Sequence, residues 1–221
     1  MIREKAMNRP EEIAGRFFTH TAGHDIIEKI SKQKGMDSML YIIRHGLTDW
    51  NVRHKLQGRT DIPLNETGRQ MAEAAAAEYR DIPLDLCYCS PLIRAKETAE
   101  ILLRGRDVPI LCDDRLREMS FGDYEGVENS FSIPDCPVNV IFQHPEAYTE
   151  SVGGAETFEE LFARTGAFLE EVIDPLMAEG KNVLIVGHGA MNLSIISRIR
   201  NLPISEFWSG RIRNCEMIRL I

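Results

Sequence analysis

The chain lacks the features that mark a membrane-spanning or secreted protein. None of its 221 residues falls in an apolar run approaching the ~20 residues that a transmembrane helix needs. Its first ten residues, MIREKAMNRP, lack the apolar stretch of a secretory signal. We therefore expect a soluble protein that does not use a membrane as its partner.

Cysteine is scarce and is not arranged for cross-linking or metal binding. The five cysteines are odd in number and scattered, and no paired C-x-x-C spacing occurs. Cys87 and Cys89 would lie on one face of a strand, which is a poor geometry for a disulfide. Reduced thiols are typical of the cytoplasm. The sequence predicts a cytoplasmic protein with no metal and no other cofactor.

The chain has no excess of positive charge. Thirty-four acidic residues outnumber 26 basic ones, for a formal net charge of −8. This balance argues against nucleic acid or an anionic membrane as the main partner. A small anionic ligand needs only local positive charge. Arg44, Arg53, Lys55 and Arg59 lie close to His45 in sequence and can supply it.

Residues 1–38 precede the first predicted strand and are predicted to form a helical extension. The positions of Phe17 and Phe18 fit one short amphipathic helix, and those of Ile26 and Ile30 fit a second. Their apolar side chains need cover from the domain or from a partner chain, so a homodimer stays open.

From Met39 onward, apolar strand patterns alternate with helical ones. Strands separated by helices predict an α/β domain over residues 39–221, with a mostly parallel sheet covered on both faces. Residues 127–154 contain three prolines and two glycines and are predicted to be irregular. We expect strands over residues 39–43, 85–89, 108–112, 182–186 and 216–221, and helices over residues 68–79, 90–104, 157–174 and 190–200.

Two histidines are expected just past the carboxyl ends of strands. His45 follows the first strand and lies beside Arg44, and His188 lies between two glycines after the fourth. Ligands of open α/β sheets bind at this edge. The pattern predicts an anion site that contains a nucleophile, although a lone histidine beside glycine is more often structural.

Arg94 is expected in the first turn of a helix that begins at Ser90-Pro91, with Ser90 as the N-cap. A helix N-terminus favours phosphate, and a guanidinium can bind two phosphate oxygens. A solvated helix arginine is the alternative interpretation.

A longer set of motifs resembles the histidine phosphatase superfamily, the phosphoglycerate mutase-like family, whose members pass a phosphoryl group through a phosphohistidine. The resemblance covers roughly residues 39–221 and implies a three-layer α/β/α sandwich. Its motifs are Arg44-His45-Gly46-Leu47-Thr48-Asp49-Trp50-Asn51, Gln57-Gly58-Arg59-Thr60-Asp61-Ile62-Pro63-Leu64 followed by Gly68, Ser90-Pro91-Leu92-x-Arg94-Ala95-x-x-Thr98-Ala99, Leu116-Arg117-Glu118, Phe121-Gly122, Glu125-Gly126, Gly153-Gly154-Ala155-Glu156-Thr157 and His188-Gly189.

The resemblance also implies roles for individual residues. His45 resembles the nucleophile, and Glu118 resembles the acid that protonates the leaving oxygen. Arginines would balance the phosphate charge, so no metal is expected. The residues implied to bind phosphate or substrate are Arg44, Asn51, Gln57, Gly58, Arg94, His188 and Gly189.

Some positions depart from the family pattern and leave the substrate open. Gly187 stands where serine or threonine is common, and Tyr124 stands where tryptophan is frequent. Mutases of this kind usually follow the catalytic glutamate with Arg-His-Tyr-Gly, and here Met119 and Ser120 follow it. They also tend to carry a longer insertion than residues 127–154.

Three functions remain open. The sequence favours a phosphatase that acts on a small phosphorylated metabolite. A phosphoglycerate mutase is the alternative, and a non-catalytic module that binds a phosphorylated ligand is a remote third.

The irregular segment 127–154 is predicted to form the wall that selects the substrate. It carries Phe131, Phe142 and Tyr148, whose rings could close over the part of the ligand beyond the phosphate. The alternative is that these rings only pack the segment onto the domain.

Overall fold

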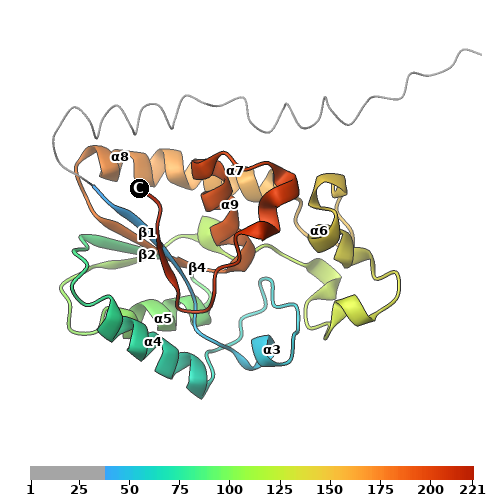
Figure 1. Cartoon of the computed structure of the whole chain (residues 1–221), viewed down its shortest axis with the longest axis horizontal. Coiled ribbons are helices and arrows are strands. Elements are labelled where there is room, and N and C mark those ends of the chain that lie inside the picture. Colours follow the sequence, from blue (N-terminus) through green and yellow to red (C-terminus); the bar gives the residue numbers. More distant parts are fainter. Residues whose placement is uncertain (1–37) are drawn as a thin grey trace, which may run out of the picture.

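The computed structural model describes residues 38–221 (Figure 1). The predicted extension falls almost entirely on residues 1–37, outside the described part, and stays a prediction. One five-stranded sheet runs in the order β3-β2-β4-β1-β5, with β5 antiparallel to β1 and the other neighbours parallel. Every predicted strand is present: β1 (Leu40–Arg44), β2 (Leu86–Cys89), β3 (Ile110–Cys112), β4 (Val183–Gly187) and β5 (Met217–Arg219). β1 and β4 are shifted by one residue from the prediction, and the other three are shorter than predicted.

Helices cover both faces of the sheet, which confirms the three-layer sandwich (Figure 1). Alternate strand residues point to opposite faces. Ile42 and Ile185 belong to one apolar cluster, and Ile43 and Val186 belong to the other. The first cluster packs under α7 (Phe158–Phe168), α8 (Asp174–Ala178) and α9 (Gly189–Arg200), and the second under α4 (Glu66–Glu78) and α5 (Ile93–Leu102).

The predicted start of α5 at Ser90-Pro91 is wrong. The Ser90 backbone N–H donates to Val186 O, so Ser90 still belongs to the pairing with β4. Leu92 is also extended, and the helix begins at Ile93. The carboxylate of Asp61 caps it by accepting from the Ile93 N–H at 2.7 Å. Arg94 nevertheless lies in the first turn, as predicted.

The helix opened by the capping box of Thr157 does not end near Asp174-Pro175. It continues through a π-helical segment, Leu169–Ile173, into α8, which ends at Ala178. Pro175 lies in the first turn of α8, where its missing N–H is tolerated. The predicted end is therefore wrong, because the π segment changes the hydrogen-bond pattern before the proline.

The segment 127–154 is irregular, as predicted, and extends from the sandwich on the right of Figure 1. It contains α6 (Val140–Gln143) and the short 3₁₀ turns Ser130–Ser132, Pro137–Asn139 and Pro145–Ala147. Its anchor is Trp208, in the 3₁₀ segment η7 (Ile204–Ser209), whose Nε1–H donates to Ile141 O at 2.7 Å.

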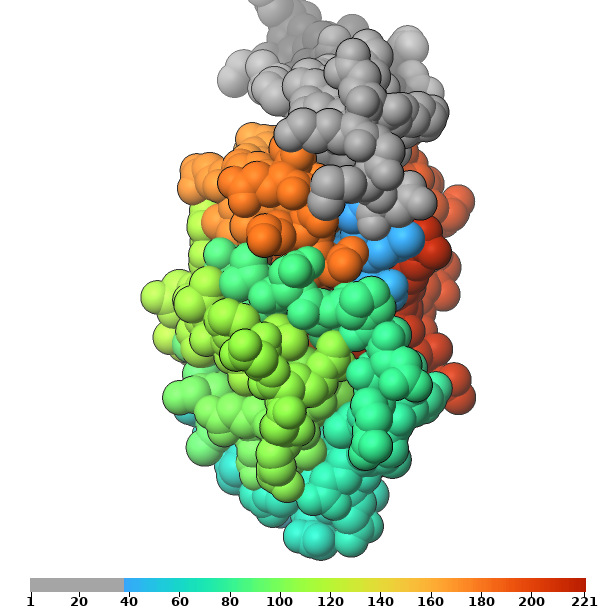
Figure 2. Space-filling view, turned by 90° about the vertical axis from the view of Figure 1, so that its left-hand side faces the viewer, coloured from blue at the N-terminus to red at the C-terminus, as the bar shows by residue number. Residues whose placement is uncertain are grey.

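Figure 2 shows the end of the molecule at which the parallel strands begin, away from their carboxyl ends. Within residues 38–221, no helix is long and apolar enough to cross a membrane. All five cysteines are free. The Sγ atoms of Cys89 and Cys112, on neighbouring strands, lie 3.4 Å apart, at hydrogen-bond distance and without a disulfide.

Candidate active site

A cavity of about 590 Å³ lies at the carboxyl edge of the sheet. β1 and β4 are neighbours in register, with Arg44 opposite Gly187, so His45 and His188 follow side by side. Their rings lie 5.2 Å apart between centroids. The predicted site residues that line the cavity are Arg44, His45, Asn51, Gln57, Gly58, Arg94, Glu118 and Gly189. His188 is fully buried and touches His45 without lining the cavity.

His45 is held as a neutral imidazole with one nitrogen free. Its Nδ1 lies 2.7 Å from Gly46 O, and only a protonated nitrogen can make that bond. The proton therefore sits on Nδ1, and Nε2 keeps its lone pair. Burial lowers the pKa of His45 well below 6.5, and the positive charges of Arg94 and Arg44 lower it further.

His188 carries its proton on the opposite nitrogen. Its Nδ1 accepts a hydrogen bond of 3.2 Å from Arg94 Nε, so the proton sits on Nε2. Burial, together with Arg94 and His45, lowers the pKa of His188 well below 6.5, which keeps the ring neutral. Within residues 38–221, Nε2 is buried without a hydrogen-bond partner. It is a donor that lacks an acceptor.

Arg94 is fully buried and aligned by three hydrogen bonds. Besides the bond to His188, its guanidinium donates to Thr60 O at 2.8 Å and to Gly58 O at 2.7 Å. A guanidinium has five N–H groups, so two remain. Burial lowers the pKa of Arg94 to about 10, which leaves it charged at neutral pH. It can therefore offer a fixed positive charge to an anion in the cavity.

Arg44 supplies a second cation at the end of β1. Its guanidinium donates to Ile212 O at 3.0 Å, while its buried Nε has no partner within residues 38–221. Arg44 and Arg94 both lie close enough to His45 to lower its pKa, and the His188 ring lies beside it. Such an arrangement is suited to an oxyanion.

Glu118 is engaged by four backbone N–H groups. One carboxylate oxygen accepts from Gly189 at 2.8 Å and Ala190 at 3.2 Å, and the other accepts from Met119 and Met191, both at 2.9 Å. Three of these donors open α9, so Glu118 caps that helix. A carboxylate offers about four acceptor positions, and all are occupied. To take up a proton, Glu118 must release one of these bonds.

Asn51 and Gln57 form the polar side of the cavity next to a capping box. The Asn51 Oδ1 accepts from the Thr48 N–H at 3.1 Å, so its amide nitrogen is the atom it can offer to a ligand. Gln57 Oε1 lies 2.9 Å from Thr48 Oγ1. Both side chains are thus oriented before any ligand binds.

The glycine at position 187 has a packing explanation. A Cβ there would overlap the Met191 methyl group and the Asn192 Oδ1. That same Oδ1 accepts from the His188 N–H at 3.1 Å, and the Asn192 amide donates to Ile43 O at 3.0 Å. Asn192 therefore holds the backbone of His188, and Gly187 leaves room for it.

Several site residues were not predicted. Asn214 donates to His45 O at 2.7 Å, and Trp208, Ile212 and Arg211 line the cavity. They lie in an irregular stretch between α9 and β5 that carries no motif, so no sequence signal pointed to them. Thr98 belongs to the predicted motif around Arg94, but its role was not predicted: its hydroxyl accepts from the Gly46 N–H at 3.1 Å.

The outer wall of the cavity is largely apolar. Phe142 packs between Phe121 and Trp208, with ring centroids 5.5 Å and 5.0 Å away, and all three line the cavity. Tyr148 instead is buried, and its hydroxyl donates to Ala155 O at 3.1 Å. Of the three rings predicted to close over the ligand, Phe142 lines the cavity and Tyr148 packs the core. Phe131 is exposed and packs against Phe142 outside the cavity lining.

The comparisons with known proteins agree with this geometry. The family model of the histidine phosphatase superfamily (branch 1) matches residues 40–221. The chain is 37% identical over 158 residues to the uncharacterized phosphatase PhoE of Bacillus subtilis, covering 72% of this chain and 75% of that protein. It is 33% identical over 153 residues to a 2,3-bisphosphoglycerate-dependent phosphoglycerate mutase of Cytophaga hutchinsonii, covering 68% and 72%.

A solved structure, Bacillus stearothermophilus YhfR, superimposes with a TM-score of 0.75 at 32% identity, covering 82% of this chain and 90% of that one. The chain therefore belongs to the histidine phosphatase superfamily. Its named relatives include both phosphatases and mutases.

Proposed function

We propose that this protein is a phosphatase that hydrolyses small phosphomonoesters through a phosphohistidine on His45. The observation that carries the proposal is the pair of opposite tautomers. His45 presents a lone pair on Nε2, and His188 holds a proton on Nε2 with no acceptor. A phosphoryl group placed between them would meet a nucleophile at phosphorus and a donor at oxygen.

In the first step, His45 Nε2 attacks phosphorus and the bond to the leaving oxygen breaks. Negative charge on the transferring group is stabilised by Arg44, Arg94 and the Nε2–H of His188. These donors are already aligned, so little reorganisation is needed. Glu118 first releases one of its backbone N–H bonds and takes up a proton from solvent, and then donates this proton to the leaving oxygen.

In the second step, water attacks the phosphohistidine and Glu118 accepts its proton. Phosphate leaves, and Glu118 passes this proton to solvent before its carboxylate returns to its position at the start of α9. General acid–base assistance of this kind contributes roughly 10²–10⁴-fold. The arginines carry out the charge neutralisation, so the proposed reaction needs no metal.

A phosphoglycerate mutase is the second candidate, and one observation favours it. Lys55, Arg211 and Arg213 also line the cavity and could bind the additional anionic groups of a bisphosphoglycerate. Lys55 and Arg213 are, however, already close to Glu128 and Glu216. The apolar rings of the cavity wall cannot form hydrogen bonds or ion pairs with the anionic groups of such a ligand. The phosphatase is therefore the better-supported function.

The experiment is a parallel assay of the purified chain. Phosphate release from p-nitrophenyl phosphate and from a panel of phosphorylated metabolites is measured beside interconversion of 2- and 3-phosphoglycerate. We expect the rate of phosphate release from the best substrate of the panel to exceed the rate at which 2- and 3-phosphoglycerate are interconverted. Mutase turnover that dominates would establish the second candidate, and ligand binding without either reaction would establish a non-catalytic module.

The natural partner in this proposal is a small phosphorylated metabolite, with no role for nucleic acid or a membrane. A cytoplasmic location belongs to the same proposal, because free thiols in all five cysteines fit a reducing compartment. A homodimer, suggested by the apolar residues of the extension, is tested by light scattering of the full chain.

A further inference from the structure

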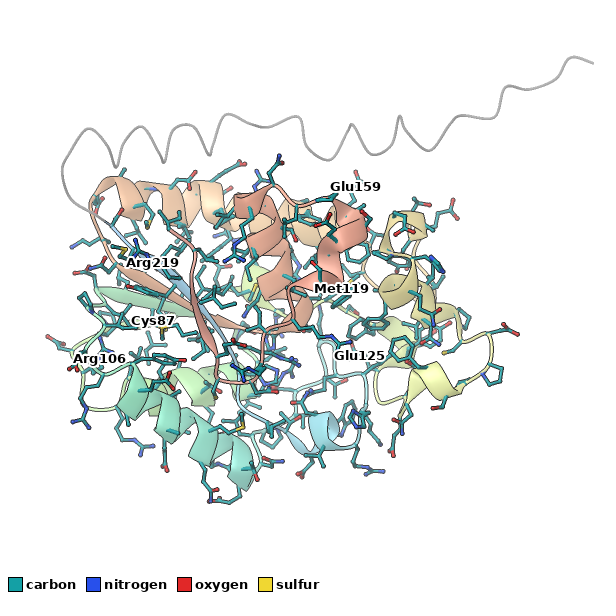
Figure 3. The ribbon with its side chains drawn as sticks, viewed as in Figure 1. Cys87, Arg106, Met119, Glu125, Glu159 and Arg219 are labelled. Atoms are coloured by element: carbon teal, nitrogen blue, oxygen red, sulfur yellow. The ribbon has the colours of Figure 1, made fainter. Side chains whose placement is uncertain are left out.

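Glu125 binds the loop that holds Arg94, although it lies outside the cavity lining. One oxygen of its carboxylate accepts from the Arg59 N–H at 2.9 Å and the Phe121 N–H at 3.2 Å. The other accepts from the Thr60 N–H at 2.8 Å and the Thr60 hydroxyl at 2.5 Å. Figure 3 shows Glu125 beside this loop, which follows α3 (Asp49–Val52). A single carboxylate thus ties residues 59 and 60 to the segment that follows Glu118.

The same loop supplies two of the three acceptors of Arg94. Gly58 O and Thr60 O accept hydrogen bonds from its terminal N–H groups. The neighbouring N–H groups, of Arg59 and Thr60, both donate to the Glu125 carboxylate. Gly58 has a φ of +52°, and a Cβ on it would overlap the Glu125 carboxylate. The glycine therefore allows the close approach of the carboxylate, and the carboxylate fixes the direction of both carbonyls.

We propose that Glu125 is a positioning residue that sets the orientation of Arg94 toward the phosphoryl group. This inference rests on the proposed function, because it assigns Arg94 to phosphate. A buried guanidinium points where its acceptors direct it. If the loop moves, the two remaining N–H groups move with it, and a charge-assisted bond weakens when its angle worsens. The negative charge of Glu125 also counters the lowering of the Arg94 pKa by burial.

The first test is Glu125→Gln, which keeps the shape and replaces one acceptor oxygen by an NH₂ group. That group would face backbone N–H donors, so the loop must shift. We expect the dissociation constant of orthophosphate, measured by calorimetry, to rise about 10- to 100-fold, by analogy with the range seen when the outer-shell partners of metal ligands are removed. Glu97→Gln is the matched control, because Glu97 on α5 also binds an arginine, Arg69, and neither side chain lines the cavity. It should leave orthophosphate affinity unchanged.

A double-mutant cycle decides whether Glu125 acts through Arg94. We expect Glu125→Gln to weaken orthophosphate binding strongly in the wild type and less than about twofold when Arg94 is already glutamine, because the two residues are coupled. An equal factor in both backgrounds would overturn the inference, since a merely structural loss does not depend on Arg94.

Thr60→Val provides a milder variant should Glu125→Gln fold poorly. It removes only the hydroxyl bond to the Glu125 carboxylate, and we expect a smaller loss of orthophosphate affinity that again requires Arg94. Binding without hydrolysis in the wild type would refute the proposed phosphatase and leave the positioning role standing. A wild type that does not bind orthophosphate would overturn the positioning role itself.

Discussion

Arg94 Nε donates a hydrogen bond to Nδ1 of His188, and this bond determines which nitrogen of His188 bears the proton. His45 has the opposite tautomer, because its Nδ1–H donates to the carbonyl oxygen of Gly46. One ring is thereby prepared to attack phosphorus and the other to donate to a phosphoryl oxygen. Arg94 thus acts in two ways, as a cation and as the group that orients His188.

The first prediction concerns stability and pH. Burial lowers the pKa of His45 and His188 well below 6.5, while both return to about 6.5 on unfolding. Below that pH the unfolded state binds more protons than the folded state. The contribution of these two neutral rings to the free energy of unfolding is therefore complete above about pH 7 and decreases as the pH falls. Each histidine should remove about 1 kcal/mol between pH 7 and pH 5.5.

Urea unfolding at both pH values checks this in the wild type and in His188→Gln. The decrease should be smaller in the variant than in the wild type by about 1 kcal/mol, the contribution of one histidine. Asp174, whose pKa burial raises to about 6, acts in the opposite direction, and the comparison cancels it. The same decrease in both proteins would mean that His188 is not a buried neutral ring.

The second prediction concerns Glu118 as the proton donor. Glu118→Gln should slow hydrolysis of alkyl phosphates about 10²–10⁴-fold and of aryl phosphates much less, because a phenolate leaves with less protonation. The variant should also melt at a lower temperature, since an amide NH₂ would face the N–H groups at the start of α9. The ratio of aryl to alkyl rates separates the two effects. An unchanged ratio would reduce Glu118 to its capping role.

The third prediction concerns the apolar wall. Phe142→Ala and Trp208→Ala should change the ranking of substrates in a panel, because both rings line the cavity, while p-nitrophenyl phosphate is still hydrolysed. Tyr148→Ala should instead lower stability and keep the ranking, because that ring is buried away from the cavity. A ranking that responds to Tyr148 and ignores Phe142 would place substrate selection elsewhere in the segment 127–154.

The fourth prediction is that hydrolysis needs no added metal. Arg44, Arg94 and His188 already supply the positive charge and hydrogen bonds that a phosphoryl group requires. Activity should survive dialysis against EDTA, and vanadate or orthophosphate should inhibit competitively. Loss of activity on EDTA treatment with recovery on adding Mg²⁺ would show that the arginines are not sufficient.

Much of the fold could be predicted from the sequence because the strands are strongly apolar and regularly separated. The positions of His45 and His188 at one sheet edge follow from two such strands being parallel neighbours. The predicted start of α5 was wrong. Ser90 resembles an N-cap in sequence, but its N–H donates a hydrogen bond to the neighbouring strand β4. A local signal cannot show a pairing made 96 residues away, at Val186.

The site was predictable where it lies in motifs and unpredictable where it depends on distant contacts. Asn214 reaches His45 across 169 positions of the chain. The tautomers of both histidines depend on hydrogen bonds that only the folded arrangement creates. The position of the Glu118 carboxylate depends on hydrogen bonds from four backbone N–H groups, three of them at the start of α9.

The central claim is that His45 becomes phosphorylated, and trapping the intermediate tests it most directly. Glu118→Gln, which should slow the second step, is mixed with a ³²P-labelled aryl phosphate and quenched in alkali, where phosphohistidine is preserved. The account predicts one label per active chain, located on Nε2 of His45. His45→Ala should take up none and lose at least about 10³-fold in turnover while remaining folded. Label on another residue, or a folded His45→Ala that still hydrolyses phosphomonoesters, would contradict it.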